Sequence, residues 1–309
     1  RSAKPLFDSP NTVQGWVNRC HKVLKDFEVF EDENDMSKSS FERLKDLEKI
    51  LIRSEIQSIG FIGADGSDYP EKDYIEKTLE SFSPINILWE KSLPLEDKSW
   101  VWPPHLHEHD LLIYSLSLPL RAADLLWLEK IPEDQPAWIS ICANQEILAE
   151  NIKAFQAQLP TKWIGRTIHL KPDNDKKYLL NNDLRVQLKN SKKNIDRTSQ
   201  RLLSRLHASW QSELELLRRE KFRSVQQRTQ WVVAGAVFAS PVPSTDLLSV
   251  AVVNGLMVQE MARIWDCSWR PEVLEVIARQ LVGAALAQGV VEWSGNTLLG
   301  AAKLHGGTW

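Results

Sequence analysis

The residues best suited to chemistry follow a short apolar run, in the segment IGFIGADGSDYPEKDYIEKTL. Gly63, Gly66 and Ser67 form a glycine turn directly after that run, and Lys72 precedes an amphipathic stretch. The order of strand, glycine turn and helix is typical of loops that wrap backbone N–H groups around phosphate. These four residues are therefore our candidates for a residual nucleotide site, for which GTP and Mg²⁺ are the ligands to consider.

The same loop lacks the side chains that a working G-x-x-x-x-G-K-[ST] loop needs. Counted from Gly63, the positions of the second glycine, the lysine and the hydroxyl hold Asp68, Tyr69 and Pro70. The lysine that reaches the outer phosphates is absent, and a carboxylate stands where phosphate would lie. We expect a loop shape without nucleotide and without catalytic residues. Nucleotide binding without turnover is the alternative, and GTP hydrolysis is the least favoured reading.

Two further residues occupy positions that nucleotide-binding folds use. Asp110 begins an apolar run, where such a fold can carry the aspartate linked to Mg²⁺. Asn144 follows another apolar run, in the place of the first residue of a guanine-reading N-K-x-D. We add both residues to the residual nucleotide site.

Three alternating histidines, His105, His107 and His109, could share one face of a strand and bind zinc. They follow Trp102-Pro103-Pro104, which favours a loop, and no distant fourth ligand is apparent. We therefore expect loop histidines and no metal.

Five apolar runs alternate with amphipathic stretches and must position these residues. This alternation predicts an α/β domain with a mostly parallel sheet. We expect strands at residues 56–62, 85–89, 110–116, 137–142 and 167–170, and helices at residues 73–82, 121–130, 145–158 and 177–188.

Helices are also predicted before and after this domain. Apolar residues at helical spacing predict helices at residues 13–27 and 41–51, joined by an acidic linker at residues 31–40. A long amphipathic helix is expected over residues 194–228. Its arginines either solvate the helix or face anionic lipid, which attracts basic residues next to apolar sequence; they are Arg201, Arg205, Arg218, Arg219 and Arg223.

The last 79 residues carry few charges, and Asp246 is the only one between Trp231 and Val258. A membrane-spanning helix needs about 20 apolar residues, and prolines interrupt the run before that length. We expect a helical hairpin that forms a soluble core, a partner-binding face or a shallow membrane-seated bundle. Its candidate membrane or partner contacts are Trp231, Phe238, Pro241, Pro243, Leu247 and Leu248.

Composition narrows the class of protein. The chain has 309 residues, 43 % hydrophobic and 26 % charged, with a net charge of −3. These values fit a globular protein, and basic residues are not interleaved with aromatic ones as nucleic-acid interfaces require. Three dispersed cysteines fit a reducing compartment. We expect no nucleic-acid partner.

The tail resembles a known family. The segment VAGAVFASPVPSTDLLSVAVVNGLMVQEMARIW, with Asn254, Gly255 and Arg263, is similar to the YcjF-like domain of unknown function. The segment ALAQGVVEWSGNTLLGAAKLHGGTW resembles the cyanobacterial and plastid-lineage type of this domain. The resemblance covers about residues 195–309 and implies a membrane-associated domain without catalytic residues, on the cytoplasmic or stromal side. It also implies that this domain is truncated here.

Domains of this family often accompany small GTPases, so the resemblance implies a degenerate GTPase-like domain in the middle of the chain. We therefore expect an N-terminal helical arm at residues 1–54, a degenerate P-loop GTPase-like α/β domain at 55–172, a basic linker and long helix at 173–230, and an all-α hydrophobic domain at 231–309. The favoured function is a non-catalytic scaffold or adaptor on a membrane. The alternatives are a GTP-binding protein with altered motifs and a soluble adaptor that binds another protein or itself.

Overall fold

The computed structural model describes residues 9–31, 33–53, 55–82, 84–96, 99–142, 154–155, 157–170, 182–239 and 256–266, with residues 280 and 283. The chain divides into two compact units. Unit 1 comprises Arg1–Lys25 and Glu33–Ser209, and unit 2 comprises Asp26–Asp32 and Trp210–Trp309.

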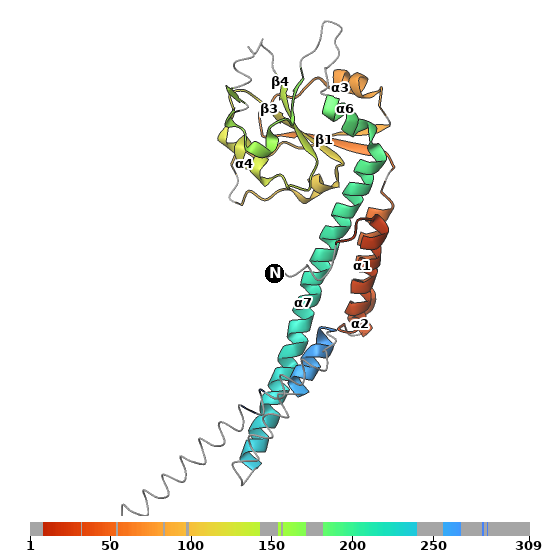
Figure 1. Ribbon diagram of the computed structural model, residues 1–309, viewed down its shortest axis with the longest axis vertical. Coiled ribbons are helices and arrows are strands. Elements are labelled where there is room, and N and C mark those ends of the chain that lie inside the picture. Colours follow the sequence, from red (N-terminus) through yellow and green to blue (C-terminus); the bar gives the residue numbers. More distant parts are fainter. Residues whose placement is uncertain are drawn as a thin grey trace, which may run out of the picture. The chain divides into compact units, whose positions relative to one another are not determined.

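Unit 1 is built on a five-stranded parallel sheet with the strand order β2-β1-β3-β4-β5 (Figure 1). All four neighbouring pairs are parallel; Ile59 of β1, for example, lies opposite both Ile87 of β2 and Leu111 of β3. The prediction of an α/β fold with a parallel sheet is confirmed. The strands are β1 (Gln57–Gly63), β2 (Ile85–Trp89), β3 (Leu111–Leu116), β4 (Ala137–Cys142) and β5 (Thr167–Leu170).

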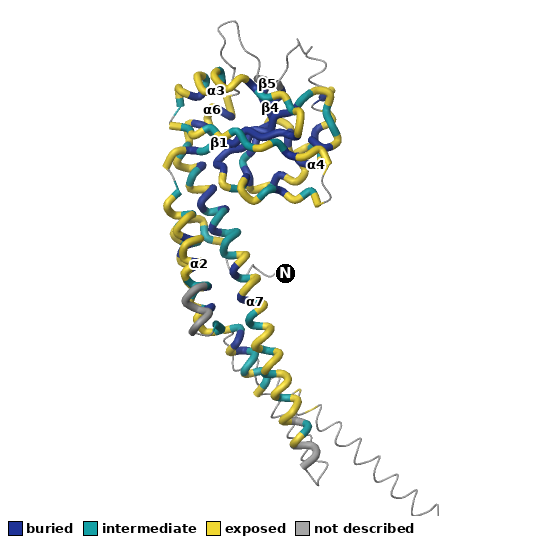
Figure 2. The backbone as a smooth tube through the Cα atoms, turned by 180° about the vertical axis from the view of Figure 1, so that it is seen from behind, coloured by how far each residue is buried: buried dark blue, intermediate teal, exposed yellow. Residues whose placement is uncertain are grey.

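Helices cover both faces of the sheet, which explains why its strands read as continuous apolar runs. On one face, α3 (Lys72–Leu79) and α6 (Asn182–Lys189) pack on Ile59, Phe61 and Ile113. On the other face, α4 (Ala122–Lys130) packs on Ile62, Tyr114 and Ile139. All six residues of β3 are buried, and buried residues gather at the centre of the sheet (Figure 2). Two short 3₁₀ helices, η1 (Pro104–Glu108) and η2 (Thr161–Trp163), pack on the same face of the sheet as α4.

The N-terminal helices are α1 (Val13–Glu28) and α2 (Glu33–Leu51). The expected acidic linker at residues 31–40 is wrong, because α2 begins at Glu33 and runs through most of that segment. Its acidic residues lie at the start of the helix, where the helix dipole favours negative charge. Within unit 1, α1 packs on the first part of α7: the Cys20 thiol donates to the Leu203 carbonyl at 3.8 Å, and the Trp16 and His207 rings meet edge to face.

The long helix α7 spans Ser191–Ala239, 49 residues. It extends the predicted helix at both ends and takes in Trp231, which we had placed at the start of the tail. No glycine or proline interrupts it before Gly235, and it ends two residues before Pro241. Proline disrupts a helix interior, so the sequence after Ala239 favours a helix end near this position.

In unit 2, the second part of α7 packs against two short segments of chain. Leu214 is buried in this unit, as is Phe27 from the segment Asp26–Asp32. Residues 256–264 are helical and bring Trp265 to α7, where its ring N–H donates to Glu215 at 3.0 Å. The predicted hairpin around Pro241 and Pro243 lies outside the described residues.

Candidate functional site

The sequence-predicted glycine turn lies at the carboxyl end of β1. Gly63 ends the strand, and a Cβ there would lie 2.8 Å from the Ser115 carbonyl and 2.9 Å from Ser67 Cβ. Gly66 has φ +71°, a left-handed conformation that glycine adopts without steric cost. The chain leaves β1 for β2 on one side and then returns to β3 on the other. Parallel sheets bind ligands at the carboxyl ends of strands where the order switches in this way.

A single arginine from the neighbouring connection engages this turn. Arg121, which precedes α4, donates from Nη2 to the Ser67 hydroxyl at 2.7 Å and from Nη1 to the Asp65 carbonyl at 2.5 Å. Its Nε donates to the Asp124 carboxylate at 2.8 Å. The guanidinium therefore ties the β1 turn to the start of α4, and we call Arg121, Asp124, Ser67 and the Asp65 carbonyl the arginine clamp.

Buried side chains hold the arginine clamp in place. The Asp124 side chain is 0 % exposed, and it also accepts a hydrogen bond of 3.1 Å from the Tyr114 hydroxyl. The hydrogen bond to Asp124 raises the pKa of Arg121. Burial, with the charge of Asp124 in addition, raises the pKa of Tyr114 far above its usual range. Arg121 and Tyr114 therefore keep their protons, and thus remain hydrogen-bond donors to Asp124, over the physiological pH range.

The rest of the turn is also bonded to neighbouring strand ends. The Asp68 N–H donates to the Ser117 hydroxyl at 2.7 Å, and the Ser92 hydroxyl donates to the Asp65 carboxylate. Lys72 begins α3 and places its ammonium 5.2 Å from the centre of the Trp89 ring. Lys72 is thus engaged in a cation–π contact with β2, while Ser67 is held by Arg121.

Asp110 does not join this turn. It precedes β3, and in a parallel sheet a residue before β3 lies at the edge opposite to the end of β1. Its buried carboxylate accepts from Arg53 Nη1 at 2.7 Å and from the Ser58 N–H at 2.8 Å. The structure therefore brings Gly63, Gly66 and Ser67 together but separates Asp110 from them. Asn144 lies outside the described residues.

The three histidines lie in and beside η1 rather than along a strand. His109 is buried and contacts the Glu90 carboxylate at 2.8 Å, and His105 lies 3.4 Å from the other oxygen of Glu90. Burial lowers the pKa of His107 to about 4. In the part of the chain that the structure describes, no three His, Cys, Asp or Glu side chains are grouped so as to hold a metal ion.

Most of the predicted basic contacts on α7 have partners within their own unit. Arg201 is 6 % exposed and donates to the carbonyls of Asp134, His107 and His109 at 2.9–3.1 Å. Burial lowers its pKa to about 10. Arg205 pairs with Asp134 in unit 1, and in unit 2 Arg218 pairs with Asp26 and Arg219 with Glu215. Arg223 is exposed.

Apolar candidates near the end of α7 lie on the surface. Trp231 is 79 % exposed and Val232 52 % exposed. Phe238 belongs to α7, whereas Pro241, Pro243, Leu247 and Leu248 lie outside the described residues. Among the helices that the structure describes, none combines the length and the apolar character needed to cross a bilayer.

Sequence reasoning missed the residues that organise the turn, namely Arg121, Asp124 and Tyr114. A usable indication was present, because Arg121 and Asp124 are three residues apart at the start of a predicted helix, where side chains at that spacing meet. The contact with Ser67 had no such indication.

Comparison with known proteins gives one family match. Residues 201–309 match the family model described as "Domain of unknown function (DUF697)". The match covers most of α7 and the tail, which is the region whose sequence resembled a domain of unknown function. No curated protein matches the chain.

Proposed function

We propose that the protein is a non-catalytic, GTPase-like scaffold that associates with a membrane surface through a C-terminal domain of the YcjF-like type. The sheet domain keeps a strand, a glycine turn and a helix in the order that phosphate-binding folds use. Its strand order is one that doubly wound nucleotide-binding folds share. The residues of the turn, however, serve the fold itself.

The observation that carries this proposal is the arginine clamp. A phosphate group in the β1 turn needs free backbone N–H groups, a lysine and a hydroxyl for Mg²⁺. The Ser67 hydroxyl is engaged by Arg121 at 2.7 Å, and the Asp68 N–H by Ser117 at 2.7 Å. A nucleotide would have to break these contacts and displace a guanidinium that also pairs with the buried Asp124. We therefore assign the turn a structural role. In this proposal the domain acts as a scaffold and does not hydrolyse GTP.

The exposed apolar end of α7 supports the membrane half of the proposal. Trp231 and Val232 face solvent next to a sequence region of low charge. Tryptophan is the residue that most favours the interface between lipid headgroups and hydrocarbon. The matched domain begins within α7, so the same helix joins the sheet domain to the proposed membrane contact.

Calorimetry of the whole chain with GTP and GDP, each with Mg²⁺, tests the proposal that the GTPase-like domain does not bind nucleotide. We expect no binding heat, and a saturable heat with a stoichiometry near one would overturn it in favour of a GTP-binding protein. Flotation with vesicles of neutral and of anionic lipid tests the proposed membrane association. We expect the chain to float, and Trp231→Ala to reduce the floated fraction. A chain that stays with the soluble fraction and scatters light as a defined oligomer would instead favour a soluble adaptor.

A further inference from the structure

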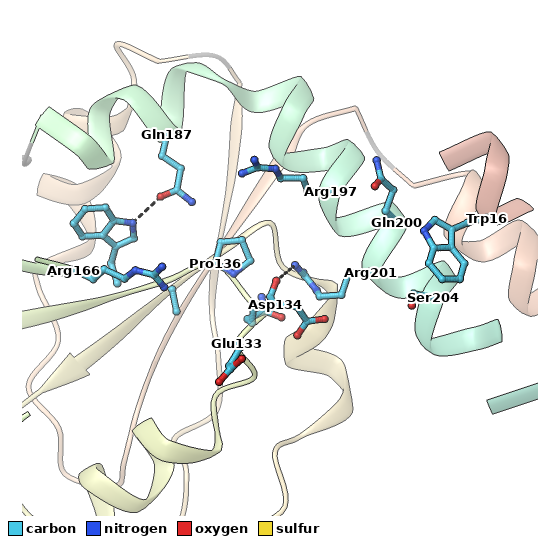
Figure 3. A pocket seen from close by; sticks show the side chains of 13 residues that line it. Trp16, Glu133, Asp134, Pro136, Arg166, Gln187, Arg197, Gln200, Arg201 and Ser204 are labelled. Atoms are coloured by element: carbon cyan, nitrogen blue, oxygen red, sulfur yellow. Dashed lines mark hydrogen bonds between the residues drawn. The ribbon is translucent and has the colours of Figure 1, made fainter. Parts of the chain in front are cut away.

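A groove of about 580 Å³ lies in unit 1 at the edge of the sheet opposite to the β1 turn (Figure 3). Its floor is formed by residues 133–138, which lead into β4, and by Arg166, which directly precedes β5. Its walls come from α6, from Trp16 of α1 and from the first part of α7. The volume is in the range of about 300–1,000 Å³ that is usual for small-molecule sites.

Two arginines line this groove without an internal partner. The guanidinium groups of Arg166 and Arg197 are exposed, and neither makes a hydrogen bond or an ion pair with any residue that the structure describes. Figure 3 shows Arg197 extending from α7 toward Gln187 of α6. Their donors are planar forks, which suit the two oxygens of a carboxylate or phosphate.

A fixed amide adds a third donor. Gln187 accepts the ring N–H of Trp138 through its Oε1 at 2.7 Å. This bond orients the side chain, so that the Gln187 NH₂ group is left to donate toward the groove. The Trp138 ring and Pro136 contribute apolar surface beside the amide.

The helix wall is polar. Arg197, Gln200, Arg201 and Ser204 follow the spacing i, i+3, i+4 and i+7, which places them on one face of α7. Arg201 anchors this face to the floor, since it donates to the Asp134 carbonyl at 3.1 Å.

The acidic residues of the groove do not cancel its positive charge. Asp134 is paired with Arg205 at 3.1 Å. Glu133 remains as the single negative lining residue without such a pair, against the two guanidinium groups of Arg166 and Arg197. An anionic group beside Arg166, Arg197 and Gln187 therefore meets a net positive field with three donors.

We propose that this groove binds a small organic anion. Its carboxylate or phosphate is held by Arg166, Arg197 and the Gln187 amide, and its apolar body lies against Pro136 and Trp138. The body is required because a groove of 580 Å³ is far larger than an inorganic phosphate. The site is independent of the arginine clamp, which lies at the carboxyl edge of the sheet.

Calorimetric titration of the whole chain with phenyl phosphate and with benzoate tests the proposal. We expect one of the two to bind with a Kd of about 1 mM or tighter, and the tighter probe identifies the head group. Neutral benzamide should not bind, and inorganic phosphate should bind at least about tenfold more weakly than phenyl phosphate. Equal affinity for phenyl phosphate and inorganic phosphate overturns the organic part of the proposal.

Variants separate this site from unspecific charge effects. Arg166→Ala and Arg197→Ala should each weaken probe binding by about tenfold, since each loses charged hydrogen bonds. Lys192→Ala removes one positive charge from another part of α7 and should bind as the wild type does. Thermal melts of all three should match the wild type, because these side chains are exposed. No binding of either probe to the wild type, or unchanged binding by both arginine variants, overturns the proposal.

Discussion

The guanidinium of Arg121 donates a 2.7 Å hydrogen bond to the hydroxyl of Ser67, 54 positions earlier in the chain. This contact turns a loop with the placement of a phosphate site into a junction between β1 and α4. The same guanidinium neutralises Asp124, whose side chain is fully buried. The β1 turn, the start of α4 and the buried Tyr114 thus form one bonded unit, and several consequences can be measured.

Replacing Arg121 should destabilise unit 1. Arg121→Ala leaves the buried Asp124 carboxylate with only the Tyr114 hydroxyl as a partner among the residues that the structure describes, and we expect a loss of about 2–3 kcal/mol in the free energy of unfolding. Urea denaturation measures this loss. Arg223→Ala removes an exposed arginine of α7 and should change stability by less than about 0.5 kcal/mol. Equal stability of the two variants would show that the clamp contributes nothing.

Removing the carboxylate of Asp110 should be costly for stability without any effect on ligands of the β1 turn. Asp110→Ala leaves Arg53 and the Ser58 N–H without a buried acceptor, which we expect to cost about 3 kcal/mol. Denaturation gives this value directly. If a nucleotide binds to the wild type and binding disappears in a folded Asp110→Ala protein, then our placement of Asp110 away from the turn is contradicted.

Replacing Gly63 and Gly235 by alanine should change the stability of the protein in opposite directions. At Gly63 a Cβ would lie 2.8 Å from a backbone carbonyl, so Gly63→Ala should destabilise by about 1–3 kcal/mol. At Gly235 a Cβ meets nothing within 4 Å, and alanine is the better helix former, so Gly235→Ala should stabilise by up to about 1 kcal/mol. Thermal melts of both variants check the prediction, which fails if the signs agree.

His107 should make stability depend on pH in the acid range. Burial lowers its pKa from the ordinary value of 6.5 to about 4, so the unfolded chain binds the proton first as pH falls. Its contribution to stability is therefore complete above about pH 6.5 and is lost progressively between pH 6.5 and pH 4. Denaturation at several pH values gives the free energy of unfolding as a function of pH. Between pH 6.5 and pH 4 this free energy should fall less steeply for His107→Asn than for the wild type. His21→Asn, at an exposed position of α1, should keep the wild-type slope.

Cys20 should be protected from alkylation in the folded chain. It is buried against α7, and burial raises its thiol pKa to about 11. Because the thiolate is the reactive form, iodoacetamide at pH 8 should modify Cys20 at least about 100-fold more slowly in the native protein than in urea. Peptide mass spectrometry reports this site separately from the other cysteines. Rapid native modification would show that α1 separates readily from α7.

The sequence by itself determined the elements of unit 1. Short apolar runs such as those predicted as strands at residues 110–116 and 137–142 favour strands buried on both faces, and the structure has them within a residue of the predicted bounds. The long helix was also predictable, since α7 contains no helix breaker before Gly235. The error at residues 31–40 arose because acidic and small polar residues suggest a linker, although the same residues serve well at a helix start.

Only the tertiary structure decided which of the polar residues meet. The fold makes β1 and β3 parallel neighbours, which put Gly63, at the end of β1, at one edge of the sheet and Asp110, before β3, at the other. It also brought Arg121 onto Ser67 across 54 positions, and Arg166, Gln187 and Arg197 around one groove. Periodicity fixes which face of an element is buried, because it reflects the local geometry of the backbone. Contacts between elements depend on the packing of the whole sheet, and these contacts place a guanidinium in the turn that has the sequence position of a phosphate-binding loop.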